Sequence, residues 1–226
     1  MTNNLFRQSF LLDSLDLSQE MPASEMVGVG GIVLKLHQRG VLEVIPPTLS
    51  DESKHIIVSC GIHGDETAPM EIVDKVVTDI INGFQEVKHR LLFINAHPEA
   101  TNAHTRFIEM NLNRLFDDKD YEPSKELNIA KNLKTLVSEF YQGTDQSSRW
   151  HLDLHCAIRL SKHYSFAVSP KVRHPVRSQA LMDFVSSSQL DAVMFSNAPS
   201  STFSWFSDEN FETHALTLER GSLART

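Results

Sequence analysis

The sequence predicts an α/β protein whose central sheet is mixed, largely parallel and flanked by helices. Short runs rich in β-branched and aromatic residues alternate along the chain with longer segments whose apolar residues recur at spacings of three and four. This alternation is typical of a sheet that helices cover on both faces. The chain has 226 residues, of which 41% are hydrophobic, enough for one domain with a well-packed core or for two small ones.

Eight segments of the chain have the composition of strands. The turn-like sequence Gln38-Arg39-Gly40 separates the first two and predicts a hairpin between them. The eight segments are Gly31–Leu36, Val41–Ile45, His55–Cys60, Arg90–Asn95, Trp150–His155, Tyr164–Val168, Ala192–Phe195 and Ala215–Glu219.

Three segments between these runs have the periodicity of helices. The first is Pro69–Ile81, and its proline is tolerated because a first-turn residue has no intrahelical use for its N–H. The second is Ser124–Tyr141, which ends before Gly143, and the third is about Pro175–Ser187. In sheets of this kind, active sites gather at the carboxyl ends of strands, where loops to helices begin.

The acidic balance of the chain argues against several classes of protein. It carries 21 Lys and Arg against 29 Asp and Glu, whereas binders of nucleic acid or anionic membranes need a basic face. No apolar run approaches the roughly 18 residues that cross a bilayer, and residues 1–20 lack the pattern of a signal peptide. We therefore expect a cytoplasmic protein without nucleic-acid or membrane partners, in which Cys60 and Cys156 are free thiols.

The segment after the strand His55–Cys60 could hold a metal ion. His63 and Glu66 lie three residues apart on a glycine-flanked loop, so an imidazole and a carboxylate can point to one place. Zinc accepts both ligand types, and a hydrolytic zinc site usually takes three protein ligands plus a water. A His-x-x-Glu pair alone is a weak signal, because Glu66 would equally suit the N-terminus of the following helix.

The strand Trp150–His155 offers a third ligand. Side chains alternate along a strand, so His151, Asp153 and His155 share one face, and His155 lies at the strand's end. Asp153 could orient a neighbouring imidazole through its other nitrogen. A site made of these three residues alone is disfavoured, since His151 and His155 would stand about 14 Å apart. We therefore predict that His151 is a buried or edge histidine.

Further residues could bind substrate or take part in the reaction. Arg106 and Arg114, with Asn113 beside the latter, offer donors suited to carboxylates, although surface ion pairs are their alternative role. Glu219 ends the apolar run 215–218. Burial there would raise the pKa of its carboxyl group and make it a base, unless the side chain reaches water.

Four blocks of the sequence together resemble the succinylglutamate desuccinylase/aspartoacylase family of zinc carboxypeptidase-like hydrolases. They occur in the family's order and span nearly the whole chain. The segments 66–69 and 157–159 resemble the desuccinylase branch more than aspartoacylase proper. The four blocks are His63–Pro69, Asn111–Phe116, Asp153–Arg159 and Thr217–Glu219.

The resemblance implies a role for each candidate residue. It implies that His63, Glu66 and His155 bind one Zn²⁺ per chain. It implies that Glu219 is the catalytic carboxylate, and that Arg106 binds substrate and polarises the scissile carbonyl. Contacts to substrate carboxylates are implied for Asn113, Arg114 and Arg159.

The implied reaction is hydrolysis of the amide of N-succinyl-L-glutamate to succinate and L-glutamate. It is the last step of arginine catabolism through succinylated intermediates. Three alternatives remain open from the sequence. They are a deacylase of another N-acyl amino acid, a zinc-binding protein without activity, and a metal-free module that captures a di- or tricarboxylate.

We interpret residues 1–226 as one zinc-dependent catalytic domain, with strands and a hairpin in 1–50 and the catalytic core in 51–226. The family carries a β-rich C-terminal domain, which we expect this chain to lack because it stops seven residues past Glu219. Apolar surface exposed at that interface would favour homo-oligomers. His97 interrupts an Asn-Pro pair that is usual in the family, and we expect a local loop adjustment there.

Overall fold

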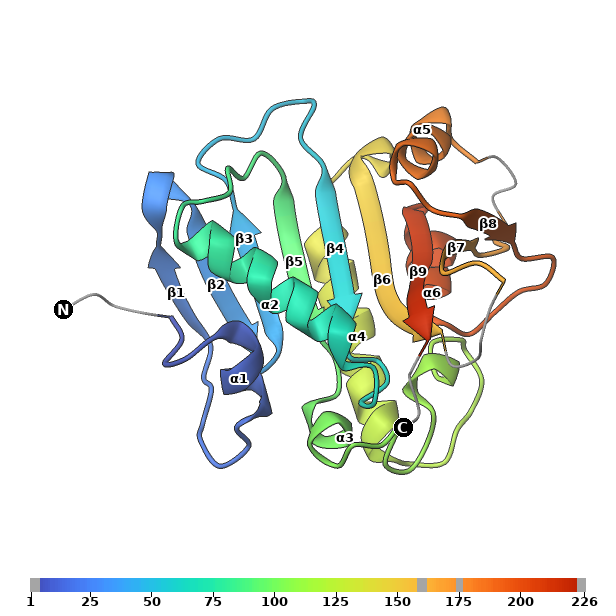
Figure 1. The fold of residues 1–226 in the computed structure, drawn as a ribbon, viewed down its shortest axis with the longest axis horizontal. Helices are drawn as coiled ribbons and strands as arrows, with labels where there is room; N and C mark the ends of the chain where they lie inside the picture. The colour runs from blue at the N-terminus through green and yellow to red at the C-terminus, as the bar shows by residue number, and fades with distance from the viewer. Residues whose placement is uncertain (1–4, 158–161, 174–176, 223–226) are drawn as a thin grey trace.

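The computed structural model describes residues 5–157, 162–173 and 177–222, and it confirms the predicted α/β class. Its sheet has nine strands in the order β1-β2-β3-β5-β4-β6-β9-β7-β8 (Figure 1). The strands are β1 Ser24–Val27, β2 Val33–Gln38, β3 Val41–Ile45, β4 His55–Cys60, β5 Arg90–Asn95, β6 Arg149–Ala157, β7 Ser165–Ser169, β8 Ala192–Phe195 and β9 His214–Ser222.

The centre of the sheet is parallel, and antiparallel pairs flank it. Strands β5, β4, β6 and β9 are parallel neighbours. On one side β1, β2 and β3 join β5 through antiparallel pairs, and on the other β7 pairs antiparallel with β9 and parallel with β8. The prediction of a mixed sheet with a largely parallel centre is therefore confirmed.

Helices cover both faces of this sheet. In Figure 1, α1 and α2 lie in front of the sheet, and α4 and α6 lie behind it. Within the described ranges, every helix is too short or too polar to span a bilayer. The helices are α1 Phe10–Leu15, α2 Thr67–Ile81, α3 Pro98–Asn102, α4 Lys125–Tyr141, α5 Gln179–Ser187 and α6 Phe203–Phe211, with 3-10 turns η1 Val29–Gly31, η2 Leu112–Arg114 and η3 Gln146–Ser148.

Two of the three apolar clusters in the described residues lie on opposite faces of the sheet. On one face, Val73 and Val77 of α2 pack in a cluster that includes Phe93 of β5. On the other face, Leu133 and Val137 of α4 belong to a separate buried cluster. The central strands are therefore covered on both sides, which fixes the positions of the loops that leave their carboxyl ends.

Several elements differ from the sequence prediction. Helix α2 begins at Thr67, two residues before the predicted start, with Glu66 at its N-cap position. Helix α5 begins at Gln179, where the Ser178 hydroxyl accepts a hydrogen bond from the Leu181 N–H and ends the preceding loop. Strand β1 and helices α1, α3 and α6 were not predicted at all.

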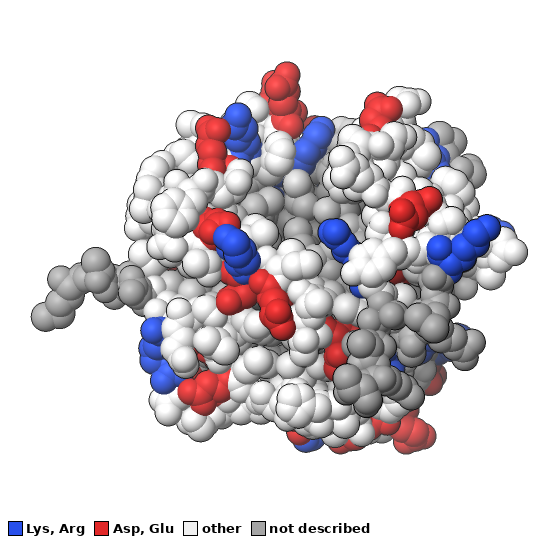
Figure 2. All heavy atoms as spheres, viewed as in Figure 1, with Lys and Arg blue, Asp and Glu red and all other residues white. Residues whose placement is uncertain are grey.

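Charges of both signs are spread over the molecule. Figure 2 shows acidic and basic side chains interspersed over the face that Figure 1 presents. Neither sign forms a continuous field on that face, so the net charge of −8 is distributed rather than concentrated there.

Candidate metal centre

The loop from β4 to α2 is packed tightly enough to require glycine. Gly61 has a φ of +66°, which side-chain-bearing residues rarely adopt. A Cβ atom on Gly64 would lie 2.2 Å from the backbone carbon of Ala100, and the Gly64 N–H donates to the Arg106 carbonyl. The loop is therefore held against its neighbours, and His63 and Glu66 leave it toward the end of β6.

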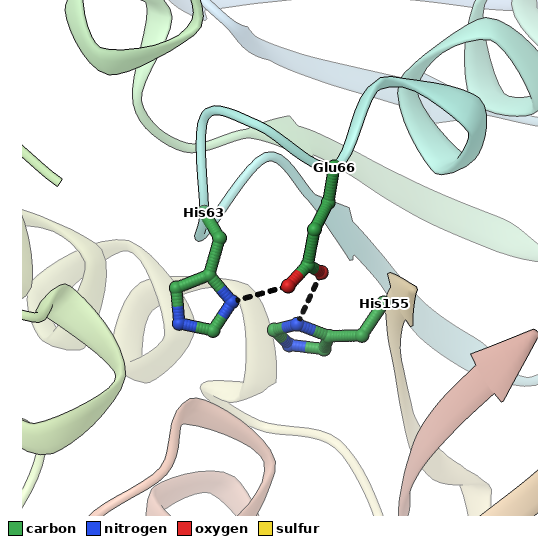
Figure 3. Close-up of side chains that lie close together, drawn as sticks. All are labelled: His63, Glu66 and His155. Carbon is green, nitrogen blue, oxygen red and sulfur yellow. Dashed lines mark hydrogen bonds and ion pairs between the residues drawn. The ribbon is translucent and has the colours of Figure 1, made fainter. Parts of the chain in front are cut away.

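The structure brings the three predicted metal ligands together. His63 Nδ1 lies 2.9 Å from Glu66 Oε1, and His155 Nδ1 lies 2.9 Å from Glu66 Oε2 (Figure 3). All three side chains are buried. Their nearest ligand atoms lie within 4.8 Å of one another, and among the described residues this is the cluster whose geometry could hold a metal ion.

The outer nitrogens of both imidazoles also face acceptors. His63 Nε2 lies 3.1 Å from Asn111 Oδ1, which is identified as an oxygen because it accepts the Asn113 N–H. His155 Nε2 lies 3.1 Å from Asp153 Oδ2. A neutral imidazole has one N–H, so a ring that donates outward presents a lone pair to Glu66. A cation among the two Nδ1 atoms and the carboxylate would satisfy this arrangement, which is the donor set that zinc takes.

The electrostatics of the cluster agree with a cation site. Burial alone would raise the pKa of Glu66, but in the metal-free protein His155 and His63 can donate to it from Nδ1 when their rings are protonated, and this holds that pKa far below the usual range. Burial would lower the pKa of His155, yet the charge of Asp153 and its hydrogen bond, with Glu66, raise it well above the usual value. The pocket thus holds a carboxylate and favours positive charge beside it.

Glu219 lies next to the cluster on the neighbouring strand. In the parallel pairing of β6 and β9 it stands opposite His155. Its Oε2 atom is buried and has no hydrogen-bond partner within the described residues. Burial raises the pKa of this carboxyl group above its ordinary value. A carboxylate so placed is a stronger base than one in water, which agrees with the raised pKa expected from the sequence.

The predicted substrate residues lie at different distances from this cluster. Arg106 reaches it, because its Nη1 donates to Glu66 Oε1 at 2.8 Å. Asn113 is buried and its Oδ1 accepts the Phe203 N–H, which leaves its amide N–H groups as the atoms that could meet a ligand. Arg114 is exposed and donates to the Asn113 carbonyl. Arg159 lies outside the described residues.

A buried carboxylate that was not predicted holds the loop carrying Arg106. Glu126 is fully buried, and its Oε1 accepts the N–H groups of Ile108 and Glu109 as well as a hydrogen bond with His97. Burial would raise the pKa of Glu126, but these hydrogen bonds hold it below the usual range. In the sequence Glu126 is an ordinary acidic residue in the first turn of a helix, so no signal distinguished it.

The two cysteines are free and buried, as predicted. Burial raises the pKa of Cys156 to about 11, so its thiol stays protonated near neutral pH. Its backbone N–H, rather than its sulfur, takes part in the site by donating to Glu66 Oε2 at 3.0 Å.

Comparison with known proteins identifies relatives along the whole chain. Residues 52–226 match the family model described as the succinylglutamate desuccinylase/aspartoacylase catalytic domain. The chain is 64% identical over 225 residues to a protein named succinylglutamate desuccinylase from Vibrio parahaemolyticus, and 64% identical to one of the same name from Vibrio cholerae. These alignments cover the whole of this chain but only 66% of the length of each relative.

Solved structures give the same result. An X-ray structure of the desuccinylase from Vibrio parahaemolyticus has a TM-score of 0.95 at 64% identity and covers 98% of this chain and 76% of that one. The desuccinylase from Chromobacterium violaceum has a TM-score of 0.84 at 31% identity, over 95% and 69% of the two chains. A metallo-carboxypeptidase from Burkholderia cenocepacia shares the fold at 18% identity and a TM-score of 0.59. The chain belongs to the succinylglutamate desuccinylase/aspartoacylase family.

Proposed function

We propose that the chain carries the site of a zinc-dependent amidohydrolase that cleaves N-succinyl-L-glutamate to succinate and L-glutamate. The observation that carries the proposal is the bridge from Glu66 to the Nδ1 atoms of His63 and His155, with an acceptor behind each imidazole. The substrate follows from relatives named succinylglutamate desuccinylase at 64% identity. Such a reaction would complete arginine breakdown through succinylated intermediates in the cytoplasm.

His63, Glu66 and His155 are the residues that would hold the zinc ion. Their ligand atoms already lie close together, and the Nε2 atom of each imidazole faces an acceptor oxygen. Little side-chain freedom is therefore lost when the metal binds. Zinc in such a site acts as a Lewis acid that makes water a nucleophile near neutral pH.

Glu219 is the residue that we propose moves the proton. Its raised pKa and its Oε2 atom without a partner suit it to take a proton from the attacking water. The water oxygen bonds to the amide carbon, the carbon–nitrogen bond breaks, and Glu219 returns the proton to the leaving amine. Atoms and charge balance, and the carboxylate is regenerated for the next cycle.

The arginines are suited to the charge of the substrate. N-succinyl-L-glutamate carries three carboxylates, which the net charge of −8 would repel without local cations. Arg106 borders the metal cluster and is partly exposed, so its remaining N–H groups can meet the scissile carbonyl or a carboxylate. We assign Arg114, the amide of Asn113 and Arg159 to the more distant carboxylates.

The metal content of the purified, dialysed chain tests this proposal first. We expect about one zinc per chain, lost in His155→Ala and retained in the control variant His89→Ala. The same preparation should release glutamate from N-succinyl-L-glutamate faster than from other N-acyl amino acids. Zinc with hydrolysis of a different acyl amino acid would correct the substrate, and zinc without any hydrolysis would refute the enzymatic role.

A further inference from the structure

A chain of buried polar side chains leads away from the metal cluster into the protein. His155 Nε2 lies 3.1 Å from Asp153 Oδ2, and the other carboxylate oxygen of Asp153 accepts from the Ser59 hydroxyl at 2.6 Å. Ser59 Oγ lies 2.8 Å from His151 Nε2, and His151 Nδ1 lies 2.7 Å from Ser207 Oγ. Ser59, His151, Asp153 and Ser207 are all completely buried.

Counting protons gives every bond in this chain a direction. The Ser59 hydroxyl donates its one proton to Asp153, so its oxygen must accept a hydrogen bond from the His151 Nε2–H. Burial lowers the pKa of His151 to about 4, so the ring is neutral and its Nδ1 accepts from the Ser207 hydroxyl. Asp153 can only accept, and it therefore takes the Nε2–H of His155.

We propose that Ser59, His151 and Ser207 are positioning residues that fix His155 for zinc. With one proton held on Nε2 by Asp153, His155 would release its other proton when the ion binds and present the lone pair of Nδ1 on the side of Glu66. The hydrogen bonds that link Ser207, His151 and Ser59 orient the Asp153 carboxylate on the side away from the metal cluster. Outer partners orient histidine ligands in this way in metal sites generally. This inference rests on the proposed zinc site.

The position of Ser207 links the metal cluster to the turn that carries Asn113 and Arg114. Ser207 lies on α6, whose first residue, Phe203, donates its N–H to Asn113 Oδ1 at 2.9 Å. The Phe203 ring also meets the His151 ring edge-to-face, with centroids 4.6 Å apart. One helix thus holds the end of the polar chain and the turn that carries the predicted substrate residues.

Packing alone does not account for these residues. Burying three hydroxyl or imidazole groups costs free energy that an apolar residue of similar size would not. Such a network is tolerated when each member is satisfied, and here each polar atom of His151 and each hydroxyl has a partner. The alternative is that His151 is a hydrogen-bonded core histidine that stabilises the fold and has no effect on zinc affinity.

Zinc affinity separates the two roles. We expect Ser59→Ala and His151→Leu to raise the zinc dissociation constant about 10- to 100-fold, measured by competition with a chromophoric chelator. Ser207→Ala, one bond further out, should raise it several-fold. His151→Gln should rescue binding, because its amide can donate to Ser59 and accept from Ser207.

Ser204→Ala is the matched control. Ser204 lies on the same helix, is equally buried and bonds to the Thr217 hydroxyl at 2.7 Å, off the polar chain. Thermal unfolding of the metal-free proteins should show similar losses for Ser204→Ala and Ser207→Ala. Only the second should weaken zinc binding, which a general loss of stability cannot explain.

The outcomes distinguish this inference from the proposed function. Unchanged zinc affinity in Ser59→Ala and His151→Leu would overturn the positioning role while leaving the hydrolase intact. A parent chain that binds no zinc would overturn both. Zinc binding that weakens as expected, in a chain that hydrolyses no acyl amino acid, would support the positioning role and refute the proposed reaction. Nitrogen NMR of the metal-free chain should independently show the His151 proton on Nε2; a proton on Nδ1 would contradict the assigned direction.

Discussion

The metal side of the site is built on the ends of adjacent strands, whereas the substrate side is built on the long loop 103–124 between α3 and α4. His63, Glu66 and His155 are almost fully buried, and both nitrogens of each imidazole lie close to a partner oxygen. Arg106 keeps 25% of its side-chain surface exposed and Arg114 is exposed. The side chains of the three predicted ligands are fixed before anything binds, but the arginines depend on how the loop is held.

Two polar side chains hold that loop, the buried Glu126 and the half-buried Asn111. The carboxylate of Glu126 accepts two of its backbone N–H groups, and the amide oxygen of Asn111 joins η2 to His63. Because different contacts hold the two sides, zinc binding and substrate binding should be separable by mutation.

Glu219→Gln should have the largest effect on activity while leaving the metal side untouched. The amide has nearly the shape of the carboxylate but cannot take a proton from water. We expect the turnover rate to fall by at least about 10²–10⁴-fold. Zinc content, measured on the same sample, should equal that of the parent chain. Retained turnover would refute the assigned role of Glu219.

Glu126→Ala should break the substrate side while sparing the metal side. It removes the acceptor that the N–H groups of Ile108 and Glu109 share with the buried His97 ring, which we expect to cost about 3 kcal/mol of unfolding free energy. Hydrogen exchange over 106–110 should accelerate and KM should rise, while zinc affinity changes little because Asn111, which faces His63, is held by its own contact with the Asn113 N–H. Glu99→Gln, which loses only an exposed pair with Lys125, is the control.

Much of the fold could be predicted from the sequence because its strands are compact apolar runs. Predicted and observed bounds coincide for β3, β4, β5 and β8. Helix α6 could not be predicted. Its sequence 203–211 mixes aromatic residues with Ser, Asp and Asn and shows no clear helical period. Its packing against β6, β9 and α4 stabilises it instead, and such contacts are invisible to local patterns.

The candidate site divides in the same way. His63, Glu66 and His155 were predicted from their spacing and from the family resemblance, and the buried position predicted for His151 is confirmed. The residues behind this cluster were mostly not predicted. Ser59 and Ser207, for example, contact His151 but lie 92 and 56 residues from it in the sequence. Nothing in a single sequence marks an isolated serine as the partner of a distant histidine.

Arg114→Ala tests the exposed end of the substrate side. An arginine that meets a substrate carboxylate contributes through a charge-assisted hydrogen bond, so we expect KM to rise about tenfold with turnover nearly unchanged. Lys119→Ala, which removes another exposed cation of the same loop, should leave KM within about twofold. Equal effects of the two variants would indicate general attraction of the substrate rather than a specific contact.

Asp208→Asn should have the smallest effect and should leave both sides of the site unchanged. Asp208 is a buried carboxyl group of α6, the helix that both sides share, and burial raises its pKa from 3.8 to about 7. Because the folded protein binds this proton more tightly, the contribution of Asp208 to stability is complete below pH 3.8 and is lost as the pH rises through about 7. Asparagine removes that loss, so we expect the variant to be more stable than the parent chain at pH 8 and equally stable at pH 4. Denaturant unfolding at the two pH values measures the gain. Glu99→Gln, which removes an exposed carboxylate paired with Lys125 outside α6, should show no gain. A change in zinc affinity or KM in Asp208→Asn would show instead that α6 couples the two sides.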